Sequence, residues 1–212
     1  MTTQPRYRSI AAHYVACLER HGDNHLGVDW PNEDDARTRH RVMLELLRPG
    51  VGAEPPRVLD FGCGASHLLE HIRADHWTDI DYAGLDISEP FVELSRAKFP
   101  DTRFWCLDVL TDDVSALPRF DYAVMNGVFT EKLELSYDEM FDFMSRTNER
   151  VFSLVEVGIA LNVMSKHVDW ERDDLFHVPF DEIAAFLIAN VTRNIVLRAD
   201  YGLYEYTVYA YH

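Results

Sequence analysis

Apolar residues recur along this chain first at strand spacing and then at helical spacing, with glycines between the two. Val58-Leu59-Asp60-Phe61 is a short apolar run that predicts a buried strand. After the turn Gly62-Cys63-Gly64, apolar residues return at helical intervals as Leu68, Leu69 and Ile72. A strand, a glycine turn and a helix form the opening unit of a nucleotide-binding α/β fold, where small residues let a ligand approach the backbone.

The pattern repeats downstream and predicts a mostly parallel sheet. Strands are expected over 82–86 and 102–107, and 118–130 is expected to contain the fourth strand and the loop after it. A fifth strand is expected in the second half of 150–162, whose first half is compatible with a continuing helix. Helices are expected over 88–99, 137–149 and 180–191. Strict alternation in 203–211, with Tyr204, Tyr206, Val208 and Ala210 on one face, follows a strand over 194–200 and the turn Tyr201-Gly202. The sequence therefore predicts a Rossmann-like seven-stranded sheet that ends in an antiparallel hairpin.

Residues 1–50 precede the first strand and form an addition to that fold. Apolar spacing predicts one amphipathic helix over 7–21. Asn32 is the expected N-cap of a second helix, with acidic residues in its first turn and Pro49-Gly50 beyond its end. This helical arm either covers a face of the sheet or forms a lid over a ligand, and the pattern is compatible with both.

At 212 residues the chain is expected to form one domain, with the arm over 1–50 and the core over 51–212. Such a length buries about 70% of the unfolded surface. The formal net charge of −16 argues against partners that are held through phosphates, so no nucleic-acid binding is expected. The composition does not predict an oligomeric state.

Three cysteines, Cys17, Cys63 and Cys106, lack the spacing of a metal site, so no metal is predicted. Their small, odd number favours free thiols in a reducing cytoplasm. Neither a signal peptide nor a membrane-spanning apolar stretch is visible in the pattern. We therefore expect a cytoplasmic protein with a small-molecule substrate and no membrane partner.

The glycine turn also indicates the kind of ligand. A dinucleotide fingerprint needs a third small residue where this chain has His67, and Asp60 stands where a diphosphate would meet a carboxylate. A cationic ligand suits that position better. The run D-x-G-C-G resembles motif I of class I S-adenosylmethionine (SAM)-dependent methyltransferases, and SAM carries an ammonium and a sulfonium but no phosphate.

This resemblance implies a set of SAM contacts. Asp60 and the turn Gly62, Cys63 and Gly64 are expected to hold the methionine end of SAM. Asp86, with Ile87 beside it, follows the turn at the distance where an acidic residue accepts from the ribose hydroxyls. In the resembled fold, Asp108 accepts from the adenine amino group and Val109 packs on the ring.

The loop after the fourth strand lies where such folds place the reacting atoms. It does not contain the N/D-P-P-Y/F motif of nucleobase amino-methyltransferases. Asn126 offers an amide oxygen and a backbone carbonyl to the SAM ammonium, although Asn-Gly is also a common turn. Asn162, at the expected end of the fifth strand, is a further functional candidate.

The arm resembles that of small bacterial methyltransferase-like proteins, in which H-G-x-x-x-x-G-V-D-W precedes an Arg-aromatic pair. His21 to Trp30 match, while Arg39 is followed by His40 instead of an aromatic residue. The resemblance implies that Arg39 binds the SAM carboxylate. Tyr14, expected to be catalytic together with Asn126, and Trp30 would face the sulfonium, where a cation–π contact contributes about 0.5–2 kcal/mol.

The predicted reaction is methyl transfer from SAM to a small-molecule acceptor, in secondary or surface-sugar metabolism. The alternative is cyclisation of SAM to azetidine-2-carboxylate with release of 5′-methylthioadenosine, because azetidine-2-carboxylate synthases are similar to small methyltransferases of this type. Aromatic residues expected near the site would suit either reaction: Tyr7, Tyr14, Trp30, Phe129, Tyr204 and Tyr206. A SAM-binding protein without turnover and a nicotinamide-dependent oxidoreductase are further alternatives.

Overall fold

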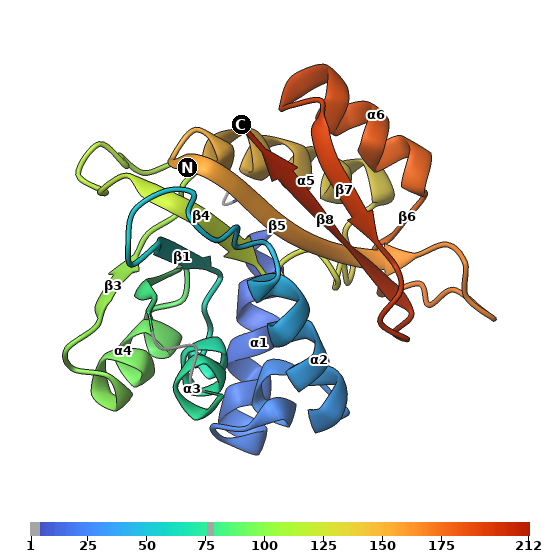
Figure 1. Ribbon diagram of the computed structural model, residues 1–212. Helices are drawn as coiled ribbons and strands as arrows, with labels where there is room; N and C mark the ends of the chain where they lie inside the picture. Colours follow the sequence, from blue (N-terminus) through green and yellow to red (C-terminus); the bar gives the residue numbers. More distant parts are fainter. Residues whose placement is uncertain (1–4, 76–78) are drawn as a thin grey trace.

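The computed structural model describes residues 5–75 and 79–212, so residues 1–4 of the predicted arm lie outside the described residues. A central sheet runs through the molecule, and helices pack on both of its faces (Figure 1). Its strand order is β3-β2-β1-β4-β5-β8-β7, and β6 pairs with β5. The strands are β1 Arg57–Phe61, β2 Asp81–Asp86, β3 Arg103–Cys106, β4 Phe120–Met125, β5 Val155–Ser165, β6 His177–Val178, β7 Asn194–Arg198 and β8 Glu205–Tyr211.

The predicted fold class is confirmed. Strands β1 to β5 pair in parallel, whereas β8 is antiparallel to both β5 and β7. The predicted number of seven strands is wrong by one, because β6 pairs in parallel with Met164 and Ser165. A strand of two residues is too short to produce a period-two pattern in the sequence.

The helices begin and end close to their predicted positions. Asn32 caps α2 as expected, accepting from the amides of Asp34 and Asp35. The segment that was open to two interpretations divides at Ser153, since α5 runs to Phe152 and β5 begins shortly after it. The helices are α1 Arg8–His21, α2 Glu33–Leu44, α3 His67–Ala74, α4 Glu89–Lys98, α5 Tyr137–Phe152 and α6 Phe180–Asn190, with a 3₁₀ turn, η1, over His25–Val28.

Two apolar clusters cover the two faces of the sheet. Helices α5 and α6 contribute to one cluster, and α2, α3 and α4 contribute to the other. Strand β8 is buried on both sides: Tyr206 packs in the first cluster, and Tyr209 and Tyr211 pack in the second. Tyr204 was predicted to share the face of Tyr206, but it precedes the strand and is 64% exposed. The alternating pattern predicted over 203–211 therefore begins two residues before the paired strand.

The order of the strands reverses between β1 and β4. Successive strands move outward from β1 to β3, and the chain then returns to place β4 on the other side of β1. A crevice opens at such a reversal, beyond the carboxyl ends of the strands, and ligands bind there in folds of this kind. Residues of α1 line that crevice, so the arm lies directly over the reversal point.

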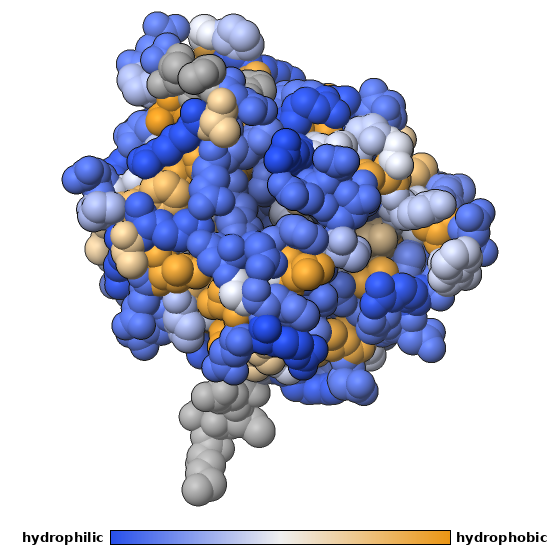
Figure 2. All heavy atoms as spheres, turned by 90° about the horizontal axis from the view of Figure 1, so that it is seen from below, coloured by the Kyte–Doolittle hydropathy of each residue, from blue (hydrophilic) through white to orange (hydrophobic). Residues whose placement is uncertain are grey.

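Polar side chains dominate one face of the molecule (Figure 2). Figure 2 shows a predominantly hydrophilic face on which hydrophobic residues form small, separate patches. No helix in the described part of the chain is both long and apolar enough to cross a membrane.

Candidate ligand-binding site

A cavity of about 160 Å³ lies at the carboxyl ends of β1, β2 and β4, beneath α1. On the same scale one water needs roughly 10–15 Å³, so the cavity is large enough for an organic ligand. It brings together the predicted site residues except Arg39. Those lining it are Asp60, Gly62, Cys63, Gly64, Asp86, Ile87, Asp108, Val109 and Asn126, together with Tyr14 and Trp30 from the arm.

The glycine turn is packed between β2 and the loop after β4. Gly62 has φ +71°, and a Cβ there would lie 2.7 Å from Cγ2 of Val128, in the loop after β4. Its amide donates to the carbonyl of Leu85 at 2.7 Å, which ties the turn to β2. The Ser95 hydroxyl donates to the Gly64 carbonyl at 2.9 Å. Glycine is required at position 62 because the backbone is left-handed and Val128 occupies the space of a side chain.

Asp60 and Asp86 place two buried carboxyl groups in the cavity wall. Asp60 accepts from the Tyr82 hydroxyl at 2.6 Å, and burial raises its pKa to about 7. Asp86 accepts from the amides of Gly64 and Ser88 at 2.9 and 2.8 Å, and burial raises its pKa above the usual range. Each carboxylate can accept about four hydrogen bonds, so Asp86 retains acceptor capacity toward the cavity.

Asp108 is the point where the arm meets the sheet. Its Oδ2 accepts from the Tyr7 hydroxyl at 2.8 Å and from Arg8 at 3.0 Å, while Oδ1 accepts from the Leu110 amide at 3.1 Å. Burial and the bond to Asp108 raise the pKa of Tyr7 to about 12, so its hydroxyl donates. Sequence reasoning placed Asp108 at the adenine end but did not find these two partners, which lie a hundred residues away.

Three buried polar atoms in the cavity wall have no hydrogen-bond partner among the described residues. They are Oδ1 of Asn126, Oγ of Ser88 and Oγ1 of Thr147. Ser88 stands at the N-cap of α4, but its side chain makes no capping bond. A buried polar group without a partner costs about 1–3 kcal/mol, so the fold leaves these three side chains unsatisfied beside the cavity.

Tyr14 and Trp30 close the cavity against the loop after β4. The Tyr14 hydroxyl donates to the Gly127 carbonyl at 3.3 Å. Gly127 has φ +76°, and a Cβ there would lie 3.2 Å from Cζ2 of Trp30. Burial raises the pKa of Tyr14. Burial also lowers the pKa of His40 to about 3. The His40 ring packs on Trp30, with ring centroids 5.4 Å apart. Tyr14 is therefore a hydrogen-bond donor at neutral pH and His40 is uncharged.

Arg39 lies behind the wall instead of in it. Its Nε donates to Glu205 at 2.7 Å, and Glu205 accepts from Nδ2 of Asn162 at 3.0 Å. Oδ1 of Asn162 then accepts from the Gly127 amide at 2.8 Å. Glu205 was missed by the sequence reasoning, although its position as the only charged residue in β8 was a usable signal. The chain of bonds connects the arm to the residue that follows Asn126.

The charge and aromatic content of the wall restrict the ligand. Within the described chain, the lining includes three aspartates but neither Lys nor Arg, so a phosphate would find no counter-charge. Of the six aromatic residues expected near the site, Tyr7, Tyr14 and Trp30 line the cavity. The expectation was wrong for the others, because Phe129 and Tyr206 are fully buried in the core and Tyr204 is on the surface.

Comparisons with known proteins agree with this geometry. Residues 59–150 match the methyltransferase domain family. Magnesium protoporphyrin IX methyltransferase from Synechocystis PCC 6803, solved with bound SAM, is 16% identical over the full length of both chains, with a TM-score of 0.63. The 1,6-didemethyltoxoflavin-N1-methyltransferase of Burkholderia thailandensis, solved with 1,6-didemethyltoxoflavin and S-adenosylhomocysteine, is 18% identical over 100% of this chain and 91% of its own, with a TM-score of 0.65.

A third similar structure is the plantazolicin methyltransferase BpumL, in complex with a pentazolic desmethylPZN analog and SAH. It is 12% identical over 99% of both chains, with a TM-score of 0.58. At such identities the likeness establishes the fold alone, and the family match covers the segment from β1 into α5. The chain thus has the fold of these methyltransferase structures, and its residues 59–150 match the methyltransferase domain family.

Proposed function

We propose that the cavity binds SAM and that the protein transfers the SAM methyl group to a small-molecule acceptor. The observation that carries this proposal is that Asp60 and Asn126 line one cavity in whose described wall there is neither Lys nor Arg. A carboxylate beside an amide oxygen suits the ammonium of SAM. The likeness to structures that contain SAM or S-adenosylhomocysteine supports the same ligand.

The other walls suit the remaining parts of SAM. Asp86 retains acceptor capacity for the ribose hydroxyls, and Ile87 is positioned to pack beside them. Asp108 and Val109 suit adenine, with Tyr7 and Phe143 stacked on each other, centroids 4.6 Å apart, in the same wall. Arg39 would act through Glu205 and Asn162 as a positioning residue.

SAM supplies an electrophilic methyl group when it is bound. The chain then has three tasks: to hold the methionine end at Asp60, to exclude water with Tyr14 and Trp30, and to align an acceptor. Tyr14 would turn its ring face toward the sulfonium. It is unsuited to the role of a base, because its raised pKa keeps the hydroxyl protonated. The acceptor is proposed to be a small molecule of secondary or surface-sugar metabolism, since the acidic surface disfavours nucleic acid.

One observation favours cyclisation as a second candidate. The arm closes over the cavity on both sides, through Tyr7 at Asp108 and Tyr14 at Gly127, and aromatic rings form the roof. A site covered in this way leaves less room for a second substrate, and cyclisation needs none. In this reaction the neutral amine of SAM attacks its own γ-carbon, the bond from that carbon to sulfur breaks, and 5′-methylthioadenosine leaves. The proton lost from the ammonium goes to solvent, and no oxidant or reductant is needed.

Incubation of the purified protein with SAM alone, followed by mass spectrometry, separates the two reactions. Methyl transfer predicts that S-adenosylhomocysteine forms only when an acceptor is added. Methylthioadenosine together with azetidine-2-carboxylate, formed from SAM alone, would replace that proposal with cyclisation. A folded protein that does not bind SAM would contradict both. Heat-treated protein is the control for spontaneous breakdown of SAM.

A further inference from the structure

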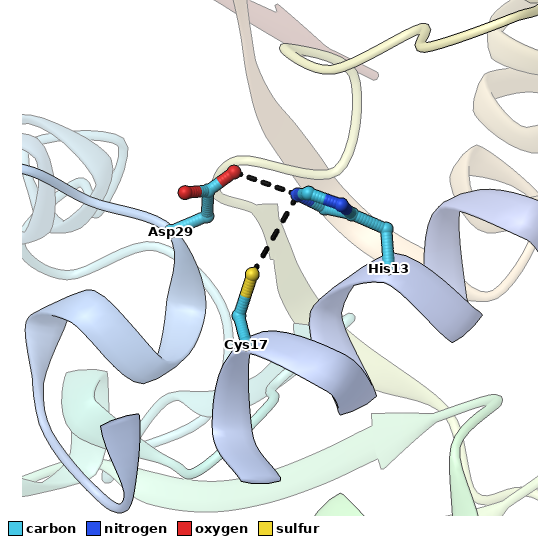
Figure 3. Close-up of side chains that lie close together, drawn as sticks. All are labelled: His13, Cys17 and Asp29. Carbon is cyan, nitrogen blue, oxygen red and sulfur yellow. Dashed lines mark hydrogen bonds and ion pairs between the residues drawn. The ribbon is translucent and has the colours of Figure 1, made fainter. Parts of the chain in front are cut away.

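His13, Cys17 and Asp29 form a compact cluster behind the roof of the cavity. His13 and Cys17 lie one turn apart on α1, and both point toward Asp29 (Figure 3). His13 Nε2, Cys17 Sγ and a carboxylate oxygen of Asp29 all lie within 4.8 Å of one another. Nε2 is 2.7 Å from Oδ2 of Asp29 and 3.7 Å from Sγ of Cys17.

The backbone is arranged to bring Asp29 to this position. Asp29 follows the 3₁₀ turn η1 in a left-handed conformation, with φ +57° and ψ +31°. Its amide donates to the carbonyls of His25 and Leu26, which holds the turn closed. Non-glycine residues seldom adopt this conformation, although Asp does so more readily than most. The strain orients one carboxylate toward α1.

The geometry differs from that of a nucleophilic triad. A triad uses the two nitrogens of the imidazole separately, one for the acid and one for the nucleophile. Here Asp29 and Cys17 both approach Nε2 of His13. Three donor atoms that lie within 4.8 Å of one another, instead of forming a relay, are arranged as ligands of a metal ion.

The donor set indicates the metal. Nitrogen, sulfur and oxygen from three side chains suit Zn²⁺, which accepts all three in tetrahedral sites. Bond lengths of a zinc site place sulfur and nitrogen about 3.6 Å apart, close to the 3.7 Å seen between Cys17 and His13. The Asp29 carboxylate would withdraw from the ring by roughly 0.6 Å to reach the corresponding separation of oxygen and nitrogen.

The cluster is open to solvent on one side, so an ion can reach it and keep one coordination position for water. The side chains of His13 and Asp29 are 32% and 41% exposed, so an ion can enter and a water can complete the fourth position. Cys17 is buried at the base of the cluster. The prediction of no metal site was based on the spacing of the cysteines alone. Two of the three donors here are not cysteines.

We propose that His13, Cys17 and Asp29 bind one Zn²⁺ ion that fastens α1 to η1. The Cys17 thiol proton is released to solvent when the thiolate binds, and no redox change occurs. Tyr14 lies between the two α1 ligands in the sequence, and Val28 and Trp30 flank Asp29; all three line the cavity. The ion would therefore stiffen the roof without touching the ligand. This inference does not depend on the proposed function, because it requires no SAM.

Titration of the full-length, tag-free protein with Co²⁺ tests this site. Cobalt replaces zinc in tetrahedral sites, and a thiolate ligand gives a sulfur-to-cobalt charge-transfer band in the near ultraviolet. We expect the band in the wild type and in the matched control Cys106→Ala, saturating at one Co²⁺ per chain, and its loss in Cys17→Ala. Cys106 is exposed and outside the cluster, so it controls for adventitious thiol binding.

A second measurement covers the case in which a variant folds poorly. Asp29→Asn keeps a hydrogen-bond acceptor for His13 but lowers the affinity for a cation. We expect added Zn²⁺ to raise the Tm of the wild type and of Cys106→Ala, with a smaller rise for Asp29→Asn and none for Cys17→Ala. Absence of the cobalt band in the wild type, or equal bands in Cys17→Ala and the wild type, would overturn the proposal.

Discussion

The floor and the roof of the cavity are built in different ways. The floor consists of residues at strand ends, such as Asp60 and Asp86, which bond to atoms in the adjacent turn or strand. The roof belongs to α1 and the segment after it, and its bonds reach distant parts of the chain. Tyr14 contacts a residue 113 positions away, and Arg39 contacts one 166 positions away. Local geometry thus fixes the floor, whereas tertiary packing alone fixes the roof.

This difference separates binding from reactivity. Under the proposed function, the floor carboxylates would recognise SAM whether or not the arm is docked. The roof would exclude water and control which reaction the bound molecule undergoes. We expect substitutions in the floor to change affinity for SAM, and substitutions in the roof to change turnover or the docking of the arm.

The largest expected effect is a loss of folding free energy when Glu205, which holds Arg39 of the arm, is removed. Glu205→Ala leaves Arg39, whose side chain is 15% exposed, without its partner, and also removes the acceptor for Asn162. Breaking a buried ion pair in this way costs about 3–5 kcal/mol, which urea denaturation would measure. Glu156→Ala removes the exposed partner of Arg119 and is the matched control, with a free energy of unfolding close to the wild type. Equal effects would refute the role of the buried chain of bonds.

The pH dependence of SAM binding tests the floor. Burial raises the pKa of Asp60 to about 7, and a cationic ligand favours the ionised form of this group. Affinity should therefore be constant above pH 7 and fall as pH drops below it, by up to about tenfold per pH unit. Calorimetry at pH 5 to 8 would measure this profile.

The variant Asp60→Asn is the control for that profile. It should bind SAM more weakly, with an affinity that no longer changes between pH 5 and 8. If the dependence persists in the variant, another carboxyl is responsible. Asp86 is the candidate, because it lines the same cavity and burial raises its pKa as well.

Removal of the Asp86 carboxylate from the floor should reduce SAM affinity by a smaller amount. Asp86→Ala should weaken SAM binding by about 1–3 kcal/mol, the cost of leaving the ribose hydroxyls without an acceptor. A titration of SAM into the variant gives the affinity, and circular dichroism verifies that the turn containing Gly64 remains folded. Unchanged affinity would remove Asp86 from the site.

The smallest expected effect distinguishes a lid from a simple cover. Trp30→Ala removes a cation–π contact worth about 0.5–2 kcal/mol, so turnover should fall by about 2- to 30-fold while the Tm changes little. Trp30→Phe retains an aromatic face and should recover part of the activity. Parallel losses of Tm and turnover would indicate that the roof is only structural.

The same contrast explains what the sequence could predict. The site residues of the floor were found because strand, glycine turn and helix follow one another locally, and Asp86 stands at a fixed distance from the turn. Tyr7 and Arg8 were not recognised as partners of Asp108, since no periodicity links residues a hundred positions apart. Arg39 was assigned to the ligand because its interaction with Glu205 is visible only in the folded chain.

Binding of SAM by the wild-type protein, measured by isothermal titration calorimetry at pH 8, tests the central claim most directly. We predict one site per chain, an affinity that falls strongly in Asp60→Asn and Asp86→Ala, and an affinity only slightly reduced in Trp30→Ala. A folded wild-type protein that releases no heat with SAM and whose Tm does not change when SAM is added would contradict the assignment of this cavity.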